Sequence, residues 1–304
     1  MTGADGNSGG MGAGVGRGIA VALVAITLFA AVDVCSKLLG QRMSPIQVVC
    51  VRFVLFVPVA VALAMRRGEG LVWRSGMPGL QVFRSLLLPV QMWFYISAFA
   101  ALPLADVQAI GASAPLLVTA LSVPLLGERV GWRRWSAVMV GFAGVVLIVR
   151  PGFAEFRLPM LYVVAGTTCW AFYQIILKVV GRVDSAATTG LWTAVIGSLS
   201  SSIACAFVWT TPDATGWWLL MAAALTGGLG HIVYSHAFSL APASTLQPFN
   251  YLLLVYAAIL GWLVFGDVPD GWTAVGAGLV VASGLYTFHR ERQSQRRLSA
   301  AAEG

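Results

Sequence analysis

The sequence predicts an all-α polytopic membrane protein with ten transmembrane helices, arranged as two inverted five-helix repeats around a central cavity. Three observations support this. The 304 residues are 58% hydrophobic and 10% charged, whereas soluble domains are about 25% charged. Apolar runs of roughly 20 residues recur, which is the length that crosses ~30 Å of hydrocarbon. Polar and turn-forming residues also return at a fixed spacing in the two halves of the chain.

Composition also restricts the functional class. The net charge of +7 is typical of basic loops that orient a membrane protein, so no nucleic-acid partner is expected. The four cysteines lie inside apolar runs without a CxxC pair, which indicates buried apolar side chains and no metal site or disulfide frame. No cofactor is expected, and the lipid bilayer is the predicted surroundings.

The chain divides into a Gly-rich segment at 1–16 that is predicted to be disordered, an apolar body, and a basic tail at 290–304. The first apolar run, 18–39, is too long for a signal-peptide core and is expected to stay as a spanning helix. The predicted spans are about 18–39, 45–65, 78–100, 104–125, 133–150, 158–180, 186–208, 216–239, 244–264 and 271–289. Turn-forming Pro, Gly and Asp residues separate them.

The distribution of basic residues predicts the orientation. With the N-terminus in the cytoplasm, 13 of the 19 Lys and Arg residues fall in cytoplasmic segments and 4 fall outside. Cytoplasmic loops of membrane proteins carry this excess of positive charge. Both termini are therefore expected in the cytoplasm.

A duplication is visible at an offset of 139 residues. It aligns Pro103 with Pro242, and the further matches are Tyr95 with Tyr234, Gln108 with Gln247, Gly127 with Gly266, and Glu128 with Asp267. The predicted units are 17–152 and 153–289. Because each holds five spans, an odd number, the second unit must be inverted relative to the first. Inverted repeats are typical of transporters whose substrate site lies near the midplane.

The stretch PLLGERVGWRRWSAVMVGFAGVVLI and its later counterpart FGDVPDGWTAVGAGLVVASG resemble the two repeats of the drug/metabolite transporter superfamily, EamA type. The second copy departs from the first where Val280 and Ser283 replace Gly141 and Gly144. The resemblance implies a ten-helix exporter of small metabolites with a central cavity. Within the superfamily, the mix of aromatic and polar residues is most similar to the bacterial aromatic amino acid exporters.

Polar residues inside the spans predict the substrate site, because polar groups in hydrocarbon normally face protein or a wet cavity. Trp170 and Gln174 share one helical face with Lys178, with Tyr173 beside them. Lys178 either extends to the membrane edge or lies at the site. Lys37 aligns with Lys178 at an offset of 141.

Asp33 and Lys37 stand one helical turn apart, acid before base. This order favours an ion pair within the helix, and the alternative makes Asp33 the partner of a substrate ammonium. Arg84, Gln91 and Tyr95 share one face of the third span. Arg84 either extends to the cytoplasmic edge or receives a substrate carboxylate.

Later in the chain, Tyr234 and His231 belong to the eighth span, and Gln247 and Asn250 belong to the ninth. These residues either hydrogen-bond between helices or contact the substrate. An intramembrane histidine is either a packing residue or a proton relay.

The predicted function is export of amino acids, aromatic and other hydrophobic ones first, or related metabolites by alternating access. The alternative is a broad-specificity effluxer of cationic drugs or purine-type metabolites. An enzyme is not expected, because the chain has no HExxH, GxSxG or phosphate-cradling loop. The coupling ion and the oligomeric state stay open, a monomer included.

Overall fold

The computed structural model describes residues 8–66, 73–128, 130–151 and 157–302, and within these ranges all regular structure is helical. The predicted all-α membrane fold is confirmed. The elements are α1 (Ser8–Gly40), α2 (Pro45–Arg66), α3 (Pro78–Ala101), α4 (Leu104–Gly111), α5 (Ala114–Leu126), α6 (Trp132–Val149), α7 (Pro159–Val180), α8 (Ala186–Cys205), α9 (Ala214–Leu240), α10 (Ala243–Leu246), the 3-10 helix η1 (Gln247–Tyr251), α11 (Leu252–Leu260), the π-helical turn η2 (Gly261–Phe265) and α12 (Gly271–Ala302).

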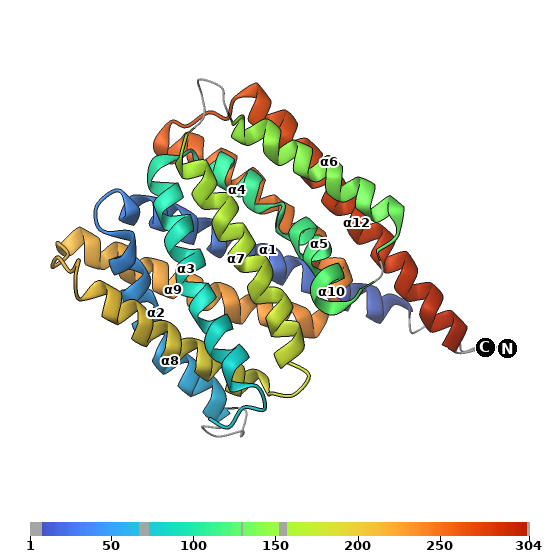
Figure 1. The fold of residues 1–304 in the computed structure, drawn as a ribbon, viewed down its shortest axis with the longest axis horizontal. Coiled ribbons are helices and arrows are strands. Elements are labelled where there is room, and N and C mark those ends of the chain that lie inside the picture. Colours follow the sequence, from blue (N-terminus) through green and yellow to red (C-terminus); the bar gives the residue numbers. More distant parts are fainter. Residues whose placement is uncertain (1–7, 67–72, 129, 152–156, 303–304) are drawn as a thin grey trace.

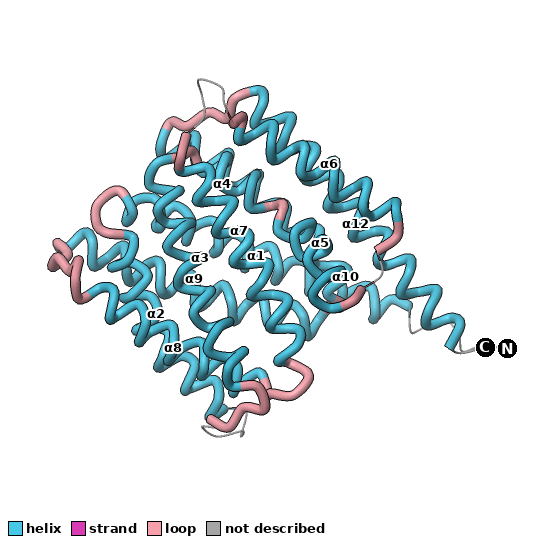
Figure 2. Tube along the Cα trace, viewed as in Figure 1, coloured by secondary structure: helices cyan, strands magenta, loops and turns pink. Residues whose placement is uncertain are grey.

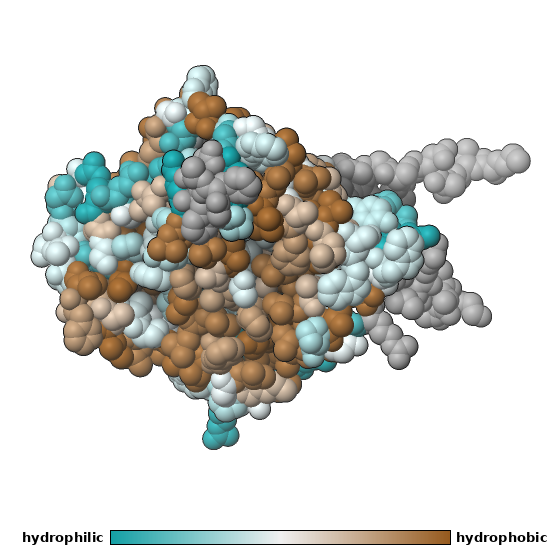
Figure 3. All heavy atoms as spheres, turned by 45° about the horizontal axis from the view of Figure 1, so that its top comes forward, coloured by the Kyte–Doolittle hydropathy of each residue, from teal (hydrophilic) through white to brown (hydrophobic). Residues whose placement is uncertain are grey.

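Nine segments of the described chain are long and apolar enough to cross a membrane. Helix α8 is not among them because Ser and Thr fill much of its 20 residues. It nevertheless packs along α2 within the bundle (Figure 1). Large apolar side chains are exposed over the helices, and Figure 3 shows them covering most of one face. Such a surface is expected against lipid and not against water.

The helices pack with the pairing of a twofold repeat. Helix α1 packs along α9, and α7, the first helix of the second repeat, packs along α3. The pairs α2 with α8 and α6 with α12 join equivalent helices of the two halves, and Figure 1 shows α6 and α12 side by side. Each half therefore uses the other half to cover its apolar faces.

Glycine permits the contact between α6 and α12. A Cβ on Gly144 would lie 2.7 Å from the carbonyl oxygen of Gly276, and one on Gly276 would lie 2.6 Å from Cγ1 of Ile148. Small residues allow such close backbone approach between membrane helices. The glycine pattern that carries the resemblance thus has a packing role here. In α12 the close approach is made at Gly276, because the positions equivalent to Gly141 and Gly144 hold Val280 and Ser283.

Both ends of the chain are more helical than composition predicts. Helix α1 begins at Ser8, inside the segment that was expected to be disordered, and α12 runs on to Ala302 through the basic tail. Extending an existing helix adds one hydrogen bond per residue without a new nucleus. The spanning parts of α1 and α12 supply that nucleus. Residues 1–7 lie outside the described ranges.

Two of the predicted spans are interrupted along their length. The span at 104–125 is divided into α4 and α5, and Figure 2 shows the loop between them. The span at 244–264 is divided into α10, η1, α11 and η2. Pro115 and Pro248 lie at these interruptions, and a proline has no N–H to donate to the carbonyl four residues earlier. The breaks fall at corresponding places: Gly111 aligns with Asn250 at the offset of 139.

Candidate functional site

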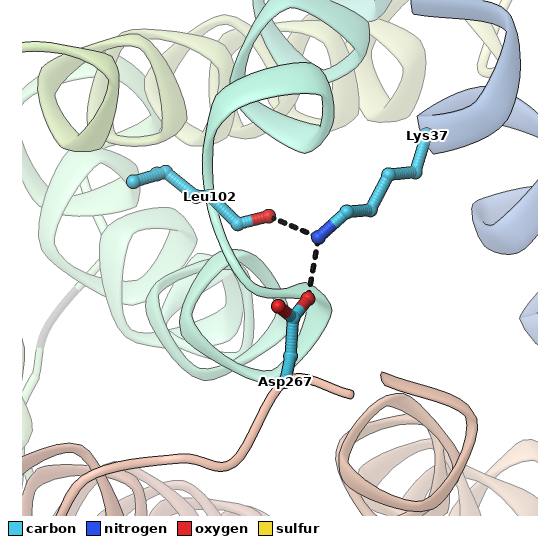
Figure 4. A network of polar contacts seen from close by, with 3 residues as sticks. All are labelled: Lys37, Leu102 and Asp267. Atoms are coloured by element: carbon cyan, nitrogen blue, oxygen red, sulfur yellow. Dashed lines mark hydrogen bonds and ion pairs between the residues drawn. The ribbon is translucent and has the colours of Figure 1, made fainter. Parts of the chain in front are cut away.

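An ion pair joins the two repeats at one end of the bundle. Nζ of Lys37 in α1 lies 2.5 Å from Oδ2 of Asp267 and donates to the carbonyl oxygen of Leu102 at 2.8 Å (Figure 4). The ammonium also lies 4.6 Å from the centroid of the Phe265 ring. The side chains of Lys37 and Asp267 are only 6% and 26% exposed. Three partners thus compensate the cost of burying this ammonium.

The ion pair expected between Asp33 and Lys37 does not form. Oδ2 of Asp33 accepts a hydrogen bond from Nε2 of Gln108 at 2.6 Å, while Lys37 reaches Asp267 and the carbonyl at the end of α3. An i,i+4 pair offers Lys37 one acceptor, whereas the neighbouring helix end offers a carboxylate and a carbonyl together. Tertiary packing therefore separates the acid from the base.

A second ion pair repeats the first at the opposite end. Nζ of Lys178 in α7 lies 2.5 Å from Oε1 of Glu128, and these side chains are 55% and 39% exposed. Lys178 thus reaches the surface, as one sequence interpretation predicted, but it ends on a carboxylate of the other repeat. The two pairs lie at opposite ends of α3. Lys37 contacts Leu102, just after the C-terminus of α3. Lys178 lies near the end of α7, and Val183, just after α7, lies against Gly76, just before the N-terminus of α3.

The turns that carry the two acids also match. Gly127 and Gly266 both have positive φ values, 68° and 71°. This left-handed conformation is favourable for glycine, which has no Cβ. Each glycine directly precedes its acid, Glu128 or Asp267, at the end of a broken span. Both acidic turns therefore aim a carboxylate at the first helix of the other repeat.

Equivalent tyrosines contact the two helix breaks. Oη of Tyr95 is 2.9 Å from Oγ1 of Thr167, which itself donates to the carbonyl of Val163, so Tyr95 is the donor. The same Oη lies 2.7 Å from where a Cβ on Gly111 would be. Tyr234 donates to Oδ1 of Asn250 at 2.8 Å, the position that aligns with Gly111. Interrupted helices in corresponding places are the usual location of a carrier's substrate site.

On the Tyr234 side, the polar group continues along the chain. Nδ2 of Asn250 donates to Oε1 of Gln247 at 3.1 Å, and the side chain of Gln247 is exposed. His231, also exposed, packs its ring at 5.0 Å from the ring of Phe29 in α1. The two predicted interpretations of these residues, interhelical bonding and substrate contact, are compatible with this arrangement.

Aromatic rings of α7 stack beside a buried arginine. Trp170 and Tyr173 have centroids 5.3 Å apart and an interplanar angle of 14°. The guanidinium carbon of Arg84 lies 5.0 Å from the Tyr173 centroid. Gln174 and Gln91 are half-buried nearby on α7 and α3. A flat aromatic face with a cation on one side suits a conjugated ring.

Arg84 is enclosed between α3 and α8. Its side chain is fully buried, and Nη2 donates to Oε1 of Gln81, the carbonyl oxygen of Thr189 and Oγ1 of Thr193, each within 2.9 Å. Arg84 thus fastens α3 to α8, with Nε and Nη1 lacking an acceptor in the described part of the chain.

The residue missed from the sequence is Arg52 in α2. It is half-buried, and Nη1 donates to Oγ of Ser36 at 3.4 Å. Its charge attracts Asp33, and Nη2 is 3.7 Å from where a Cβ on Gly227 would lie. An arginine within a spanning helix is itself a functional signal. From the sequence, Arg52 was assigned no role beyond its place in the charge balance, because no other polar residue stands at helical spacing from it in this span.

Two segments of the chain, 16–150 and 157–288, each match the EamA-like transporter family. The chain belongs to this family. Relatives include an S-adenosylmethionine uptake transporter of Rickettsia bellii, 29% identical over 277 residues that cover 91% of this chain and 95% of the relative. A riboflavin transporter of Vibrio cholerae is 31% identical over 219 residues, 72% of this chain and 73% of its own. A pseudopaline exporter of Pseudomonas aeruginosa is 25% identical over 270 residues, covering 88% and 94%.

A solved crystal structure has the same fold. It superposes with a TM-score of 0.60 at 22% identity, over 88% of this chain and 96% of its own. The EamA-like chain is thus a membrane transporter of the drug/metabolite superfamily, and its named relatives are transporters and not enzymes. None of the three relatives named above is an aromatic amino acid exporter, so that finer resemblance is not supported.

The transporter has a hollow away from the predicted site residues. A pocket of about 210 Å³ lies between α2, α3 and α8. Its wall is largely apolar, with lining residues Ile46, Val49, Leu86, Pro89, Val90, Trp93, Ser200, Ser201 and Ala204. The predicted residues instead form separate groups: Asp33 with Gln108, the two tyrosines at the breaks, and the α7 rings with Arg84. One cavity shared by all of them stays a prediction.

Proposed function

We propose that this EamA-like transporter carries S-adenosylmethionine, or a metabolite of the same build, by alternating access between two inverted five-helix units. The observation that carries the proposal is the pair of repeat-equivalent ion pairs, Lys37–Asp267 and Lys178–Glu128, one at each end of the bundle. Each pair links the first helix of one repeat to the acidic turn of the other. Rocking of the two units opens one pair while the other stays closed.

The two pairs differ in a way that suits this cycle. The Lys37 pair is buried and has additional partners, whereas the Lys178 pair is exposed to solvent at 55% and 39%. Exposed pairs contribute little free energy, so the Lys178 end is the easier to open from this conformation. With both termini in the cytoplasm, the Lys178 end faces the cytoplasm and the Lys37 end faces outward.

The substrate class combines the relatives with the chemistry of the described residues. S-adenosylmethionine carries an amino acid end, a sulfonium and an adenine ring. The stacked rings of Trp170 and Tyr173 offer a surface for adenine, and Asp33 offers an intramembrane carboxylate for a cationic group. This candidate combines the predicted amino acid chemistry with the purine alternative. Export is the predicted direction, and the substrate gradient would set it in a passive carrier.

Riboflavin is the second candidate. The Vibrio cholerae riboflavin transporter is 31% identical over 72% of this chain, and a flat ring system would suit the same α7 rings. Riboflavin carries no ammonium or carboxylate, so Asp33 and the intramembrane arginines would lack charged ligand partners. This difference favours the charged candidate. Free aromatic amino acids and cationic drugs rank behind both.

The remaining parts of the proposal follow the sequence. The units are 17–152 and 153–289, flanked by 1–16 and the basic tail at 290–304, in a bacterial inner membrane. Gln91, Gln174, His231, Gln247 and Asn250 are proposed as further substrate contacts. The carrier needs no cofactor or metal and works as a single chain.

Counterflow in proteoliposomes tests the proposal. Vesicles containing the purified chain and unlabelled S-adenosylmethionine should accumulate labelled S-adenosylmethionine transiently, whereas protein-free vesicles should not. Riboflavin, tryptophan, adenine and a cationic dye are then added as competitors. Counterflow of riboflavin and of no other compound would identify riboflavin as the substrate in place of S-adenosylmethionine. An absence of counterflow with every compound would contradict the carrier function.

A further inference from the structure

Two opposite charges lie at the same depth in the bundle. Asp33 stands seven residues before the end of α1 at Gly40, and Arg52 stands seven residues after the start of α2 at Pro45. With a rise of about 1.5 Å per residue, each lies roughly 10 Å inside the same end. Both are half-buried.

Neither group has its full set of partners. A guanidinium has five N–H donors, and among the residues that the structure describes Arg52 makes one long hydrogen bond, 3.4 Å to Oγ of Ser36. The Asp33 carboxylate accepts from Gln108 at 2.6 Å. Within the described part of the chain, the two charges form no ion pair closer than 4.0 Å. Charged groups in a membrane interior require compensation, so this arrangement leaves donors and acceptors for a third group.

Arg84 provides the contrast within the same molecule. Arg52 extends from α2, which contacts α9, whereas Arg84 extends from α3 toward α8. These are repeat-equivalent interfaces. Nη2 of Arg84 donates to three acceptors of the protein and the side chain is fully buried. Arg84 therefore serves as a cross-link whose Nε and Nη1 are enclosed by packing, whereas the half-buried Arg52 is open to a ligand.

We infer that Arg52 and Asp33 together bind the zwitterionic amino acid end of the substrate, with Arg52 receiving the carboxylate and Asp33 receiving the ammonium. The inference rests on the proposed carrier function and names the part of the substrate that this pair recognises. A guanidinium matches a carboxylate with two parallel hydrogen bonds. A zwitterion placed between the two groups neutralises both charges at once, which neither a neutral nor a singly charged ligand does.

Gly227 leaves room beside the guanidinium. A Cβ at this position would lie 3.6 Å from Cγ2 of Val32 and 3.7 Å from Nη2 of Arg52, which are ordinary contact distances. Alanine therefore fits, whereas a larger side chain would meet Arg52. Ser36 and Gln108 each supply a neutral hydrogen-bond partner, to Arg52 and Asp33 respectively.

Competition with substrate analogues tests the inference on the full-length chain in proteoliposomes. Decarboxylated S-adenosylmethionine lacks the carboxylate, and the deaminated analogue lacks the ammonium. The wild type should prefer the intact compound over each analogue by roughly tenfold or more, since a hydrogen bond to a charged group contributes about 1.5–3 kcal/mol. Arg52→Gln should abolish the preference over the decarboxylated analogue and keep the preference over the deaminated one.

Asp33→Asn should show the reverse pattern, with the ammonium preference lost and the carboxylate preference kept. Arg42→Gln is the matched control, because Arg42 lies just beyond the same end of α1 and its side chain is 49% exposed. Its preferences should equal those of the wild type. Arg52→Lys retains the charge and should keep part of the carboxylate preference, and it carries the test if Arg52→Gln does not fold.

The outcomes separate this inference from the proposed function. Wild-type transport of S-adenosylmethionine combined with an unchanged carboxylate preference in both Arg52 variants would overturn the zwitterion subsite and leave the carrier intact. Equal loss of all compounds in Arg52→Gln and Asp33→Asn would assign the two residues to folding. A wild type that carries riboflavin and not S-adenosylmethionine would overturn both.

Discussion

Lys37 and Asp267 are 230 positions apart in the sequence, and their ammonium and carboxylate groups meet at 2.5 Å. Their repeat equivalents, Lys178 and Glu128, meet at the same distance at the other end of the bundle. The first pair is buried under the ring of Phe265, and the second is open to solvent. The same contact therefore exists twice, once in buried surroundings and once in contact with solvent.

Asp267→Asn should destabilise the chain more than Glu128→Gln. Removing Asp267 leaves an ammonium whose side chain is 6% exposed, and breaking a buried pair costs about 3–5 kcal/mol. Exposed pairs contribute about 0–1 kcal/mol. Chemical unfolding in detergent micelles should show this order, with Asp213→Asn, at an exposed site, as the control. Equal losses in the two variants would contradict the assigned burial.

A double-mutant cycle should show that Lys37 and Asp267 act as a pair. Lys37→Met and Asp267→Asn are made singly and together. The double variant should lose less free energy of unfolding than the two single losses added, because the second substitution removes a charge that the first left unpaired. Additive losses would mean that Lys37 is held mainly by the carbonyl of Leu102 and the Phe265 ring.

The Lys178–Glu128 pair should give a pH dependence confined to acid conditions. The hydrogen bond from Lys178 lowers the pKa of Glu128 below its ordinary value of 4.5. A depressed folded-state pKa means that the stabilisation is present above about 4.5 and is lost as pH falls through the folded value. The Tm difference between wild type and Glu128→Gln should therefore shrink below about pH 4.5. It should stay constant between about pH 6 and pH 8.

Gly111→Ala should lower the thermal stability of the protein. Adding Tyr95→Phe to this variant should restore the stability. The added Cβ would lie 2.7 Å from Oη of Tyr95 but 3.5 Å from the nearest ring carbons, so the clash is with the hydroxyl alone. In the Phe background the extra methyl fits and improves helix propensity by up to about 1 kcal/mol. Thermal unfolding of the two single variants and the double variant measures this. Gly190→Ala, with open space around it, is the control, and a double variant as unstable as Gly111→Ala would refute the contact.

Trp170→Ala should weaken ring-bearing substrates more than small ones. The indole stacks on Tyr173 at 5.3 Å, and an aromatic contact contributes about 0.5–1.5 kcal/mol, or roughly two- to tenfold in affinity. Competition by adenine against labelled S-adenosylmethionine should fall by this factor, whereas competition by methionine should not. Trp218→Ala, at a position 77% exposed, should leave both unchanged. An equal loss of competition by adenine and by methionine would show that Trp170 does not contact the ring of the substrate.

Several parts of the site could be predicted from repeat alignment alone. The offset paired Tyr95 with Tyr234 and Glu128 with Asp267, and the structure gives the members of each pair corresponding partners. Such matches need no coordinates, because duplicated units keep their turn chemistry. The alignment does not say which partner each residue meets. Lys37 was matched with Asp33 on local spacing, and the structure joins it to the other repeat.

The relation between Arg52 and Asp33 could not be predicted from the sequence. Helical spacing detects residues that share one face of one helix, and Arg52 stands alone among apolar neighbours in α2. Its relation to Asp33 arises only when α1 and α2 lie together with their ends at one face. Pro115 and Pro248 mark in the sequence where a helix can kink, but an apolar run shows its length and not the continuity of its hydrogen bonds. The extent of the breaks between Gly111 and Ala114 and at Gln247–Tyr251 therefore came from the structure.

The sequence by itself determined the lipid environment, the helical class and the duplication, because hydrophobicity summed over about 20 residues is independent of what each residue contacts. Only the tertiary structure decided the partners of the buried charges. A buried ammonium, guanidinium or carboxylate bonds to whichever acceptor or donor packing brings within reach. These partners lie in the other repeat for Lys37, on α8 for Arg84, and on α1 for Arg52. Distances of a few ångströms between distant segments set those choices, and no periodicity along one helix contains them.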